Sequence, residues 1–354
     1  MSKLSVSVIF CLLYINFCGY NVLSIGTPRY SINLDLNPPE RWKKVGQDYA
    51  NILKNFKQDI LEHYHIPKEL VNIADKIGSD LDKYIPTPFS GEMIGLADTS
   101  NIPLSEIVLA NLLYELTAFC TSIVAQNNTG QIIHGRNLDY NLMKELKPLV
   151  IDVDFMRGGK IVYTGTTFAG YVGLLTAQKA DVLTITLNQR NEGNILENLL
   201  DLLLTNHSMV SFTVRDTLDN PNVTFQSAVN YLAYGVYLVT PAYLIVGGVN
   251  TLEGVVITRG RISAISIRQL DLVKGLWYVL ETNYDYWTSP PPSDDRRDPA
   301  IQMLDKLGRD IALDTLYSVL NRKPVCNSQT TYTTVMSAAD GAAYTTHIRD
   351  NDCS

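Results

Sequence analysis

Cys120 is the residue of this sequence best suited to act as a nucleophile. It stands where a helical pattern gives way to a series of strand-like segments. If the Phe119–Cys120 bond were cut, Cys120 would begin a new chain, and its own α-amine could serve as the base for its thiol. An α-amine titrates at about pH 8, which suits proton exchange once neighbouring groups lower its pKa. The alternative is a small buried cysteine that only packs, and counting cysteines alone does not separate the two interpretations.

Two charged residues follow on the next expected strand. The turn Asn127–Gly130 has the composition of a hairpin and returns the chain beside Cys120. Arg136 could lower the pKa of the thiol, and Asp139 could accept a hydrogen bond from the new ammonium group. Without further information the pair could equally be an ion pair at a strand end. We interpret His134 as a packed imidazole.

The two halves of the chain have different periodicities. Before Cys120 the pattern predicts one strand, Tyr30–Leu34, and helices from Pro38, over Lys68–Tyr84 and from Pro103. After it, alternation predicts strand pairs and isolated strands at Cys120–Gln126, Gln131–Asn137, Leu149–Phe155, Lys160–Thr166, Val172–Ala177, Val182–Leu187, Ala242–Val246, Gly254–Thr258, Trp277–Thr282, Thr331–Met336 and Ala343–His347. Helices are expected at Ile195–Leu204, Val223–Leu232, Asp298–Leu307 and Ala312–Leu320. Strands grouped in hairpins predict an α+β fold of two antiparallel sheets with helices outside both.

The beginning of the chain has the pattern of a secretory signal. Lys3 precedes the apolar run Leu4–Cys18, and small residues near Gly26 suit a cleavage point, so we assign residues 1–26 to a signal peptide. A buried N-terminal helix is the alternative. The mature chain is expected to be soluble, and its net charge of −7 argues against nucleic acid as a partner.

A secreted chain can be glycosylated and can form disulfide bonds. Three sequons predict N-glycosylation at Asn127, Asn206 and Asn222, with Asn127 favoured by its turn. Once the signal has left, Cys326 and Cys353 are the plausible disulfide pair and Cys120 is the free thiol. No cluster of histidine, cysteine and aspartate has zinc spacing, so we expect no metal and no cofactor.

Several long motifs resemble one known family. They are Phe119–Gln126, His134–Tyr140, Phe168–Gly173, Glu253–Arg259, Glu281–Trp287 and Asp294–Arg297. In this order they resemble the acid ceramidase and N-acylethanolamine-hydrolysing acid amidase family. The resemblance implies a lysosomal proenzyme that cleaves itself before Cys120 into a helical α subunit, residues 27–119, and a β subunit, residues 120–354. It also implies the αββα sandwich of N-terminal nucleophile hydrolases.

The resemblance assigns roles to matching positions. Cys120 is the nucleophile, Arg136 and Asp139 support it, Asn283 donates to the oxyanion, and Arg296 is a further active-site arginine. The backbone N–H of Gln189 would be a second oxyanion donor. The family usually has Glu at this position, so Gln189 predicts self-cleavage that depends less on acid.

Some motifs resemble the acylethanolamine amidase and others the ceramidase, so they point to two different substrates. Thr333–Ala338 and the proline-rich loop before Asp294 look like the acylethanolamine amidase, whereas Ile185–Asn188 and Pro241–Gly248 look more like the ceramidase. We favour a fatty-acid amide of ethanolamine over ceramide. Its long tail needs an apolar channel, supplied by the α-subunit helices, and transient contact with a membrane or micelle. Two other interpretations stay open, a silent relative that binds lipid or a protein partner, and an enzyme like the penicillin or bile-salt acylases.

Overall fold

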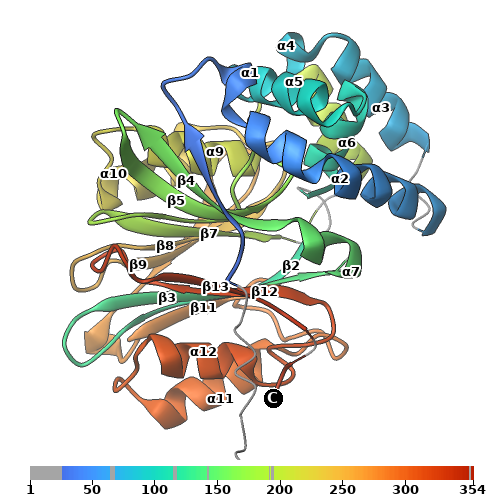
Figure 1. Cartoon of the computed structure of the whole chain (residues 1–354). Coiled ribbons are helices and arrows are strands. Elements are labelled where there is room, and N and C mark those ends of the chain that lie inside the picture. Colours follow the sequence, from blue (N-terminus) through green and yellow to red (C-terminus); the bar gives the residue numbers. More distant parts are fainter. Residues whose placement is uncertain are drawn as a thin grey trace, which may run out of the picture.

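The computed structural model describes residues 26–63, 68–114, 118–141, 143–190, 192, 195–350 and 352–354. The predicted signal peptide therefore lies outside the described residues, apart from Gly26. Two stacked sheets form the centre of the molecule, and helices cover the outer face of each (Figure 1). The predicted four-layer α+β arrangement is confirmed. No helix among the described residues is long and apolar enough to cross a bilayer.

The larger sheet has eight strands in the order β1-β4-β5-β6-β7-β8-β9-β10. Its strands are β1 Arg29–Asn33, β4 Val150–Arg157, β5 Lys160–Phe168, β6 Thr176–Lys179, β7 Leu183–Gln189, β8 Ala242–Gly247, β9 Gly254–Arg259 and β10 Ala264–Gln269. All neighbours are antiparallel except β1 and β4, which run parallel. The expectation of purely antiparallel sheets is wrong at this edge, because β1 reaches the sheet through the long helical segment and not through a hairpin.

The smaller sheet has five strands in the order β11-β2-β3-β12-β13. They are β11 Tyr278–Glu281, β2 Ala118–Gln126, β3 Ile132–Tyr140, β12 Thr330–Met336 and β13 Tyr344–Ile348. The predicted β2–β3 hairpin is confirmed, and it pairs Cys120 with Leu138 and Phe119 with Asp139. Strand β2 runs unbroken through Phe119 and Cys120, so the geometry is that of the uncleaved chain.

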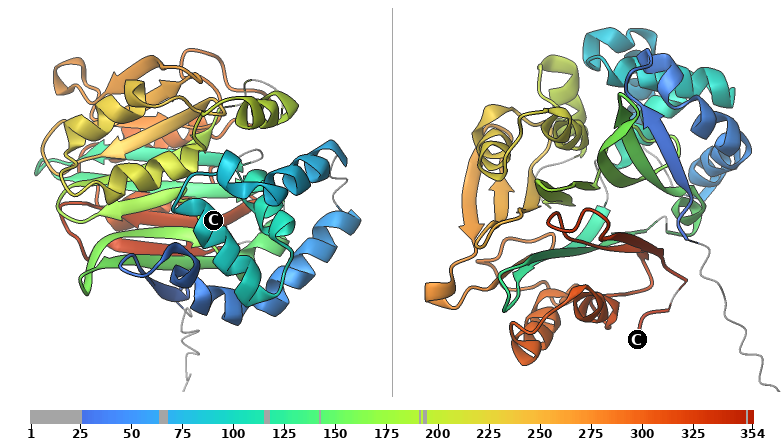
Figure 2. Two further views of the ribbon diagram at one scale, coloured as in Figure 1. Left: turned by 90° about the horizontal axis from the view of Figure 1, so that it is seen from above. Right: turned by 60° about the vertical axis from the view of Figure 1, so that its left-hand side comes forward.

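The helices form three groups, seen from two further directions in Figure 2. The first group precedes β2: α1 Pro38–Arg41, α2 Lys43–His63, α3 Lys68–Ser79, α4 Leu81–Tyr84, α5 Phe89–Ser100 and α6 Leu104–Tyr114. The second follows β7, with α8 Ile195–Leu204, α9 Val210–Asp219, α10 Phe225–Asn230 and the π-helical turn Tyr231–Gly235. The third covers the smaller sheet, with α11 Arg297–Leu307 and α12 Leu313–Asn321. Short turns of helix are α7 Met143–Leu146, η1 Lys147–Leu149 and η3 Leu272–Lys274.

Several sequence predictions need correction. The helix expected over Lys68–Tyr84 is two helices, because Asp80 leaves the helical region at φ −146° and ψ 55°. The strand expected over Val172–Ala177 begins only at Thr176. Helices α2, α5 and α9 and strand β10 were not predicted.

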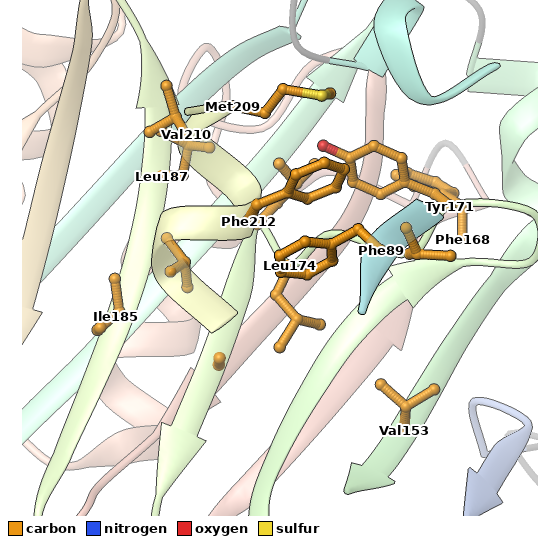
Figure 3. Packing of buried hydrophobic residues seen from close by; sticks show 14 of the residues in the cluster. Phe89, Val153, Phe168, Tyr171, Leu174, Ile185, Leu187, Met209, Val210 and Phe212 are labelled. Atoms are coloured by element: carbon orange, nitrogen blue, oxygen red, sulfur yellow. The ribbon is translucent and has the colours of Figure 1, made fainter. Parts of the chain in front are cut away.

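A buried cluster of charge and aromatic rings joins the first helices to the rest of the molecule. Glu92 on α5 is fully buried and accepts hydrogen bonds from both terminal nitrogens of Arg215 on α9, at 2.5 and 3.0 Å. Trp42 Nε1 donates to the same carboxylate at 2.8 Å. Phe89 stacks on Phe212 (Figure 3), and their ring centroids lie 4.0 Å apart. The helical segment before Cys120 is therefore anchored to the segment after it by contacts that do not need the connecting chain.

Candidate active site

Cys120 lies between the two sheets with its side chain fully buried. Arg136 Nη2 donates to its Sγ at 2.9 Å and to the Leu187 carbonyl at 3.1 Å. Arg136 Nη1 donates to the Leu175 carbonyl and to Thr176 Oγ1, at 3.1 and 2.6 Å. The guanidinium thus comes from the smaller sheet, is oriented by acceptors on the larger one, and points at the sulfur.

The Arg296 side chain contacts the backbone of Cys120. Its Nη1 donates to the Cys120 carbonyl at 2.7 Å and to Asp139 Oδ2 at 3.1 Å. Its Nη2 donates to Asn283 Oδ1 at 2.9 Å. Asp294 fixes the side chain by accepting from Nε and Nη2 at 2.6 and 2.9 Å. Such a two-pronged contact holds an arginine more rigidly than a single bond could.

Asn283 connects the cysteine to the second sheet. Its Oδ1 accepts from the backbone N–H of Cys120 at 2.6 Å, and its Nδ2 donates to the Gln189 carbonyl at 2.7 Å. The predicted site residues Cys120, Arg136, Asn283, Arg296 and the Gln189 backbone are therefore brought together.

Asp139 lies beside Cys120 and is one contact removed from it in the uncleaved chain. In the uncleaved chain the nitrogen of Cys120 is bonded to Asn283, whereas Asp139 accepts from Arg296. Its Oδ1 accepts from Thr330 Oγ1 at 2.6 Å, and Asn327 Nδ2 lies 3.4 Å from Oδ2. Asp139 is thus connected to Cys120 through Arg296, and its bond to the ammonium group of a cleaved chain stays a prediction.

The electrostatics of the site reflect its burial. Burial raises the pKa of the Cys120 thiol, Arg136 and Arg296 pull that pKa down, and Asp139 pushes it up. Arg136 has the predicted effect, but burial outweighs it in the uncleaved chain. Burial also raises the pKa of Asp139, against the opposing charge of Arg296. A dry, buried arrangement of this kind makes each remaining charge contact strong.

The other predicted residues have clear positions. His134 is buried between Thr184 Oγ1 and Thr186 Oγ1 at 2.8 and 3.0 Å, and burial lowers its pKa to about 3, which confirms a neutral packed imidazole. The Cys326–Cys353 disulfide is present. Among the sequons, Asn206 and Asn222 are exposed and Asn127 is half-buried in its turn, so glycosylation stays a prediction.

Two functional neighbours were missed from the sequence. The sequence showed Asp294 only as part of the Asp-Asp-Arg-Arg motif. Its contact with Arg296, two residues further on, depends on the conformation of the loop between β11 and α11, which has no periodic pattern. Asn188 accepts from Ser122 Oγ at 2.7 Å and donates to the Glu281 and Thr282 carbonyls, which fixes the segment that leads to Asn283. No periodicity in the sequence could have indicated this contact.

Comparison with known proteins agrees with this geometry. The family model described as the beta subunit of N-acylethanolamine-hydrolyzing acid amidase matches residues 27–85. An N-acylethanolamine-hydrolyzing acid amidase from Oryctolagus cuniculus is 43% identical over 326 residues, which is 92% of this chain and 90% of the relative. Acid ceramidase from Homo sapiens is 37% identical over 345 residues, covering 91% and 86%. A solved Caenorhabditis elegans N-acylethanolamine-hydrolyzing acid amidase ortholog, 42% identical, superposes with a TM-score of 0.60 over 65% of this chain and all of that one.

The two packed sheets with a cysteine at the start of a central hairpin define an amide-bond hydrolase of the N-terminal nucleophile class. The chain belongs to the family of N-acylethanolamine-hydrolyzing acid amidases and acid ceramidases. The sequence prediction of the family and of the fold is thereby confirmed.

Proposed function

We propose that this protein cleaves itself between Phe119 and Cys120 and then hydrolyses the amide bond of fatty-acid ethanolamides. The observation that carries the proposal is the set of contacts around one residue. The sulfur of Cys120 is bound by Arg136, its nitrogen by Asn283 and its carbonyl oxygen by Arg296. The sulfur, the nitrogen and the carbonyl oxygen of Cys120 thus each have a partner of their own.

The proposed self-cleavage begins with an acyl shift from nitrogen to sulfur. Sγ attacks the Phe119 carbonyl carbon, the C–N bond to Cys120 breaks, and the thiol proton passes to the departing nitrogen. Water then hydrolyses the Phe119 thioester, which leaves the Phe119 carboxylate and a Cys120 with a free thiol and a free amine. Asn283 holds the nitrogen and Arg136 stabilises the sulfur anion during the shift.

The same cysteine then acts on substrate. Its α-amine accepts the thiol proton, Sγ attacks the amide carbonyl carbon, and the proton moves to the leaving ethanolamine nitrogen. Water hydrolyses the acyl thioester and releases the fatty acid. In this proposal Asn283 and the backbone of Gln189 stabilise the oxyanion, and an amide donor in such a site lowers the barrier by about 3 kcal/mol.

The surroundings of Cys120 support an acyl substrate. The carbonyl of Leu187 lies 3.8 Å from Sγ, and the Leu187 side chain belongs to an apolar cluster with Tyr171, Met209 and Phe212 (Figure 3). A cavity of about 250 Å³ opens between the 82–86 segment and α8–α9, and Met209 and Phe212 line it. Residues from before and after the cleavage point thus line this cavity together, and we assign its apolar part, which includes Met209 and Phe212, to the acyl tail.

The head group follows from the relatives. Identity reaches 43% with an acylethanolamine amidase and 37% with an acid ceramidase, which favours ethanolamides over ceramide. The catalytically silent lipid binder is disfavoured by the complete set of site residues. In this proposal cleavage leaves two associated chains, residues 27–119 and 120–354. The protein matures in the lysosome or elsewhere along the secretory route. The matched family model bears the name of a beta subunit although it covers the first of these chains, so we identify the chains by position.

A denaturing gel tests the central step. The precursor, incubated at acid pH, should yield two chains, and sequencing of the second should begin at Cys120. The Cys120→Ala variant should stay whole. An active preparation whose polypeptide remains continuous through Phe119 and Cys120 would overturn the mechanism.

Product analysis tests the substrate. We expect faster release of palmitate from N-palmitoylethanolamine than of laurate from N-lauroylsphingosine, measured on the same cleaved preparation. A reversed order would assign the enzyme to ceramide.

A further inference from the structure

A two-pronged ion pair joins the two segments that the proposed function assigns to the oxyanion. Asp285 follows Asn283 by two residues in the loop after β11, and Arg190 comes directly after Gln189 at the end of β7. Arg190 donates to Asp285 Oδ1 through Nε at 2.8 Å and to Oδ2 through Nη2 at 2.7 Å. Two parallel bonds of this kind fix the relative position of the groups that they join.

A tyrosine on the neighbouring strand bonds the same carboxylate. The Tyr243 hydroxyl donates to Asp285 Oδ1 at 2.7 Å. Tyr243 is fully buried, and it pairs with Asn188 in the β7–β8 ladder. We call Asp285, Arg190 and Tyr243 the Asp285 clamp. Strands β7 and β8 belong to the larger sheet and β11 to the smaller (Figure 1), so the clamp joins the loop after β11 to the larger sheet.

The clamp is rigid because little water reaches it. The side chains of Arg190 and Asp285 are 4% and 12% exposed. Burial raises the pKa of the Asp285 carboxyl, but the bonds from Arg190 and Tyr243 outweigh burial and hold that pKa below its usual value. The carboxylate therefore stays ionised in mildly acidic solution. An ion pair shielded in this way is stronger than the same pair on the surface.

The contacts of Asn283 show what the clamp holds in place. Its Nδ2 donates to the Gln189 carbonyl at 2.7 Å. An amide nitrogen carries two N–H groups, and this bond sets the direction of the other, to which the proposed function gives the oxyanion. Donors of this kind must be held to within about 0.5 Å, and a misplacement of about 1 Å can slow a reaction about 100-fold. A tie one or two residues from each donor supplies that precision.

We propose that the Asp285 clamp is a positioning device for the oxyanion hole and sets the distance between Gln189 and Asn283. The inference rests on the proposed function, because it concerns the same site. The clamp acts on the groups that bond the acyl oxygen when negative charge develops there, so it lowers the energy of the transition state more than that of the bound substrate. Its loss should therefore lower kcat and leave KM nearly unchanged.

Kinetics of the cleaved enzyme test the proposal through Asp285→Asn. This change keeps the size of the side chain but removes the charge that Arg190 pairs with, so kcat for N-palmitoylethanolamine should fall about tenfold at nearly constant KM. Glu192→Gln is the matched control. Glu192 accepts from the same arginine at 2.5 and 2.7 Å, but its side chain is 53% exposed, so this variant should keep the wild-type kcat. Rates are normalised to the Cys120 thiol titrated with iodoacetamide.

An aldehyde separates positioning from a purely structural role. With palmitaldehyde, Sγ of Cys120 bonds to the aldehyde carbon, the π bond to oxygen breaks, and the thiol proton passes to that oxygen. Because this oxygen takes the place of the oxyanion, Ki for palmitaldehyde should rise about tenfold in Asp285→Asn. Ki for hexadecanol, which forms no such bond, should stay at the wild-type value. Neither Ki depends on the fraction of molecules that are active, so partial misfolding does not change their ratio.

Tyr243→Phe is the second variant, in case Asp285→Asn fails to fold. It removes one bond and keeps the ring, so Ki for palmitaldehyde should rise roughly threefold. A wild-type ratio of the two Ki values in the variant that folds would make the clamp a structural ion pair and overturn the proposal. Equal losses of kcat in Glu192→Gln and Asp285→Asn would also overturn it.

Failure of the proposed function has a different result. Wild type that cleaves itself but hydrolyses no acyl ethanolamide would defeat that function. The clamp is then judged by the rate of self-cleavage, because Asn283 also accepts from the backbone N–H of Cys120 at 2.6 Å. Asp285→Asn should slow self-cleavage and Glu192→Gln should not. Equal self-cleavage rates in wild type and Asp285→Asn would overturn the positioning role.

Discussion

Around Cys120, each arginine performs a distinct task. Arg136 bonds the sulfur, where negative charge develops, whereas Arg296 bonds the Cys120 carbonyl and bridges Asp139 to Asn283. Arg136 is therefore expected to govern the reactivity of the thiol. Arg296 is expected to govern its placement, because a guanidinium can satisfy several acceptors in one plane and an ammonium cannot.

The first prediction concerns Arg296→Lys. Lysine keeps the positive charge beside the buried Asp139 but loses the planar fork, so kcat/KM for N-palmitoylethanolamine should fall about 100-fold with only a small drop in Tm. Arg297→Lys is the control, because Arg297 is also buried but donates to the Asp285 and Thr288 carbonyls and not to Cys120. Equal losses of activity in both variants would contradict a placement role for Arg296.

A second prediction concerns Gln189. A glutamine side chain does not titrate in the acid range, so wild-type self-cleavage should persist to higher pH than in Gln189→Glu, whose carboxylate would ionise as pH rises. The measurement is the fraction of precursor cleaved at a fixed time across pH 4 to 7, followed on denaturing gels. Identical pH profiles for the two proteins would show that this position does not sense acid.

At the scale of elements, β11 brings an unusual carboxyl group next to the site. Glu281 is fully buried, two residues before Asn283, and its Oε1 accepts from the Thr282 N–H at 3.1 Å. Within the described residues no donor reaches Oε2. Burial raises the pKa of Glu281 to about 8, so this carboxyl is protonated under acid conditions and the strand end that carries Asn283 then holds no uncompensated charge.

A third prediction follows for stability. The folded pKa of about 8 lies above the unfolded value of 4.5, so the contribution of Glu281 is complete below pH 4.5 and is lost as pH rises toward 8. The loss should amount to a few kcal/mol at most, seen as a falling Tm between these pH values. Glu281→Gln should remove this slope, and the exposed Glu192→Gln should keep it. A wild-type Tm that rises over the same range would contradict the assignment.

The helices and strands that the sequence predicts correctly are those with a strong local pattern. The β2–β3 hairpin combines alternation with a turn, and its register alone places Arg136 near Cys120. Helix α2 was missed because, over the part whose side chains are described, its buried apolar residues Val45, Tyr49 and Leu53 form a single narrow stripe. Helix α9 was missed because its β-branched residues have low helix propensity, which burial against the larger sheet overrides.

The candidate site was only partly accessible from local pattern. Cys120 stands at the junction of the two patterns and Arg136 follows in the hairpin, but Asn283 and Arg296 lie 163 and 176 residues beyond Cys120 in the sequence. Such contacts depend on how two sheets and a loop pack, and no periodicity encodes that. The family motifs supplied those positions, and only the structure shows that Asn283 accepts from the backbone N–H of Cys120 in the uncleaved chain.

For the whole molecule, cleavage before Cys120 would leave two chains that must stay together without a covalent bond. Glu92 is one point of their contact beside the β1–β4 ladder, since Arg215 of the second chain donates to its buried carboxylate, as Arg41 and Trp42 of the first chain do. Arg215 also donates to the Val172 carbonyl at 2.6 Å and packs over the Phe89 and Phe155 rings. The contact therefore joins α5 and the chain start to α9 and the larger sheet.

The last prediction is that Glu92→Gln separates the chains after cleavage. Removing the carboxylate leaves Arg41 and Arg215 without their counter-charge, at a cost of about 3 kcal/mol. In size-exclusion chromatography the cleaved variant should release its first chain, whereas Glu92→Gln combined with Cys120→Ala should stay whole because the peptide bond still joins the two parts. Asp48→Asn removes the exposed partner of Lys44 and should leave the cleaved protein intact, since exposed pairs contribute little. If the cleaved Glu92→Gln protein stays associated at concentrations where wild type does, the β1–β4 ladder and apolar packing are enough to hold the two chains together.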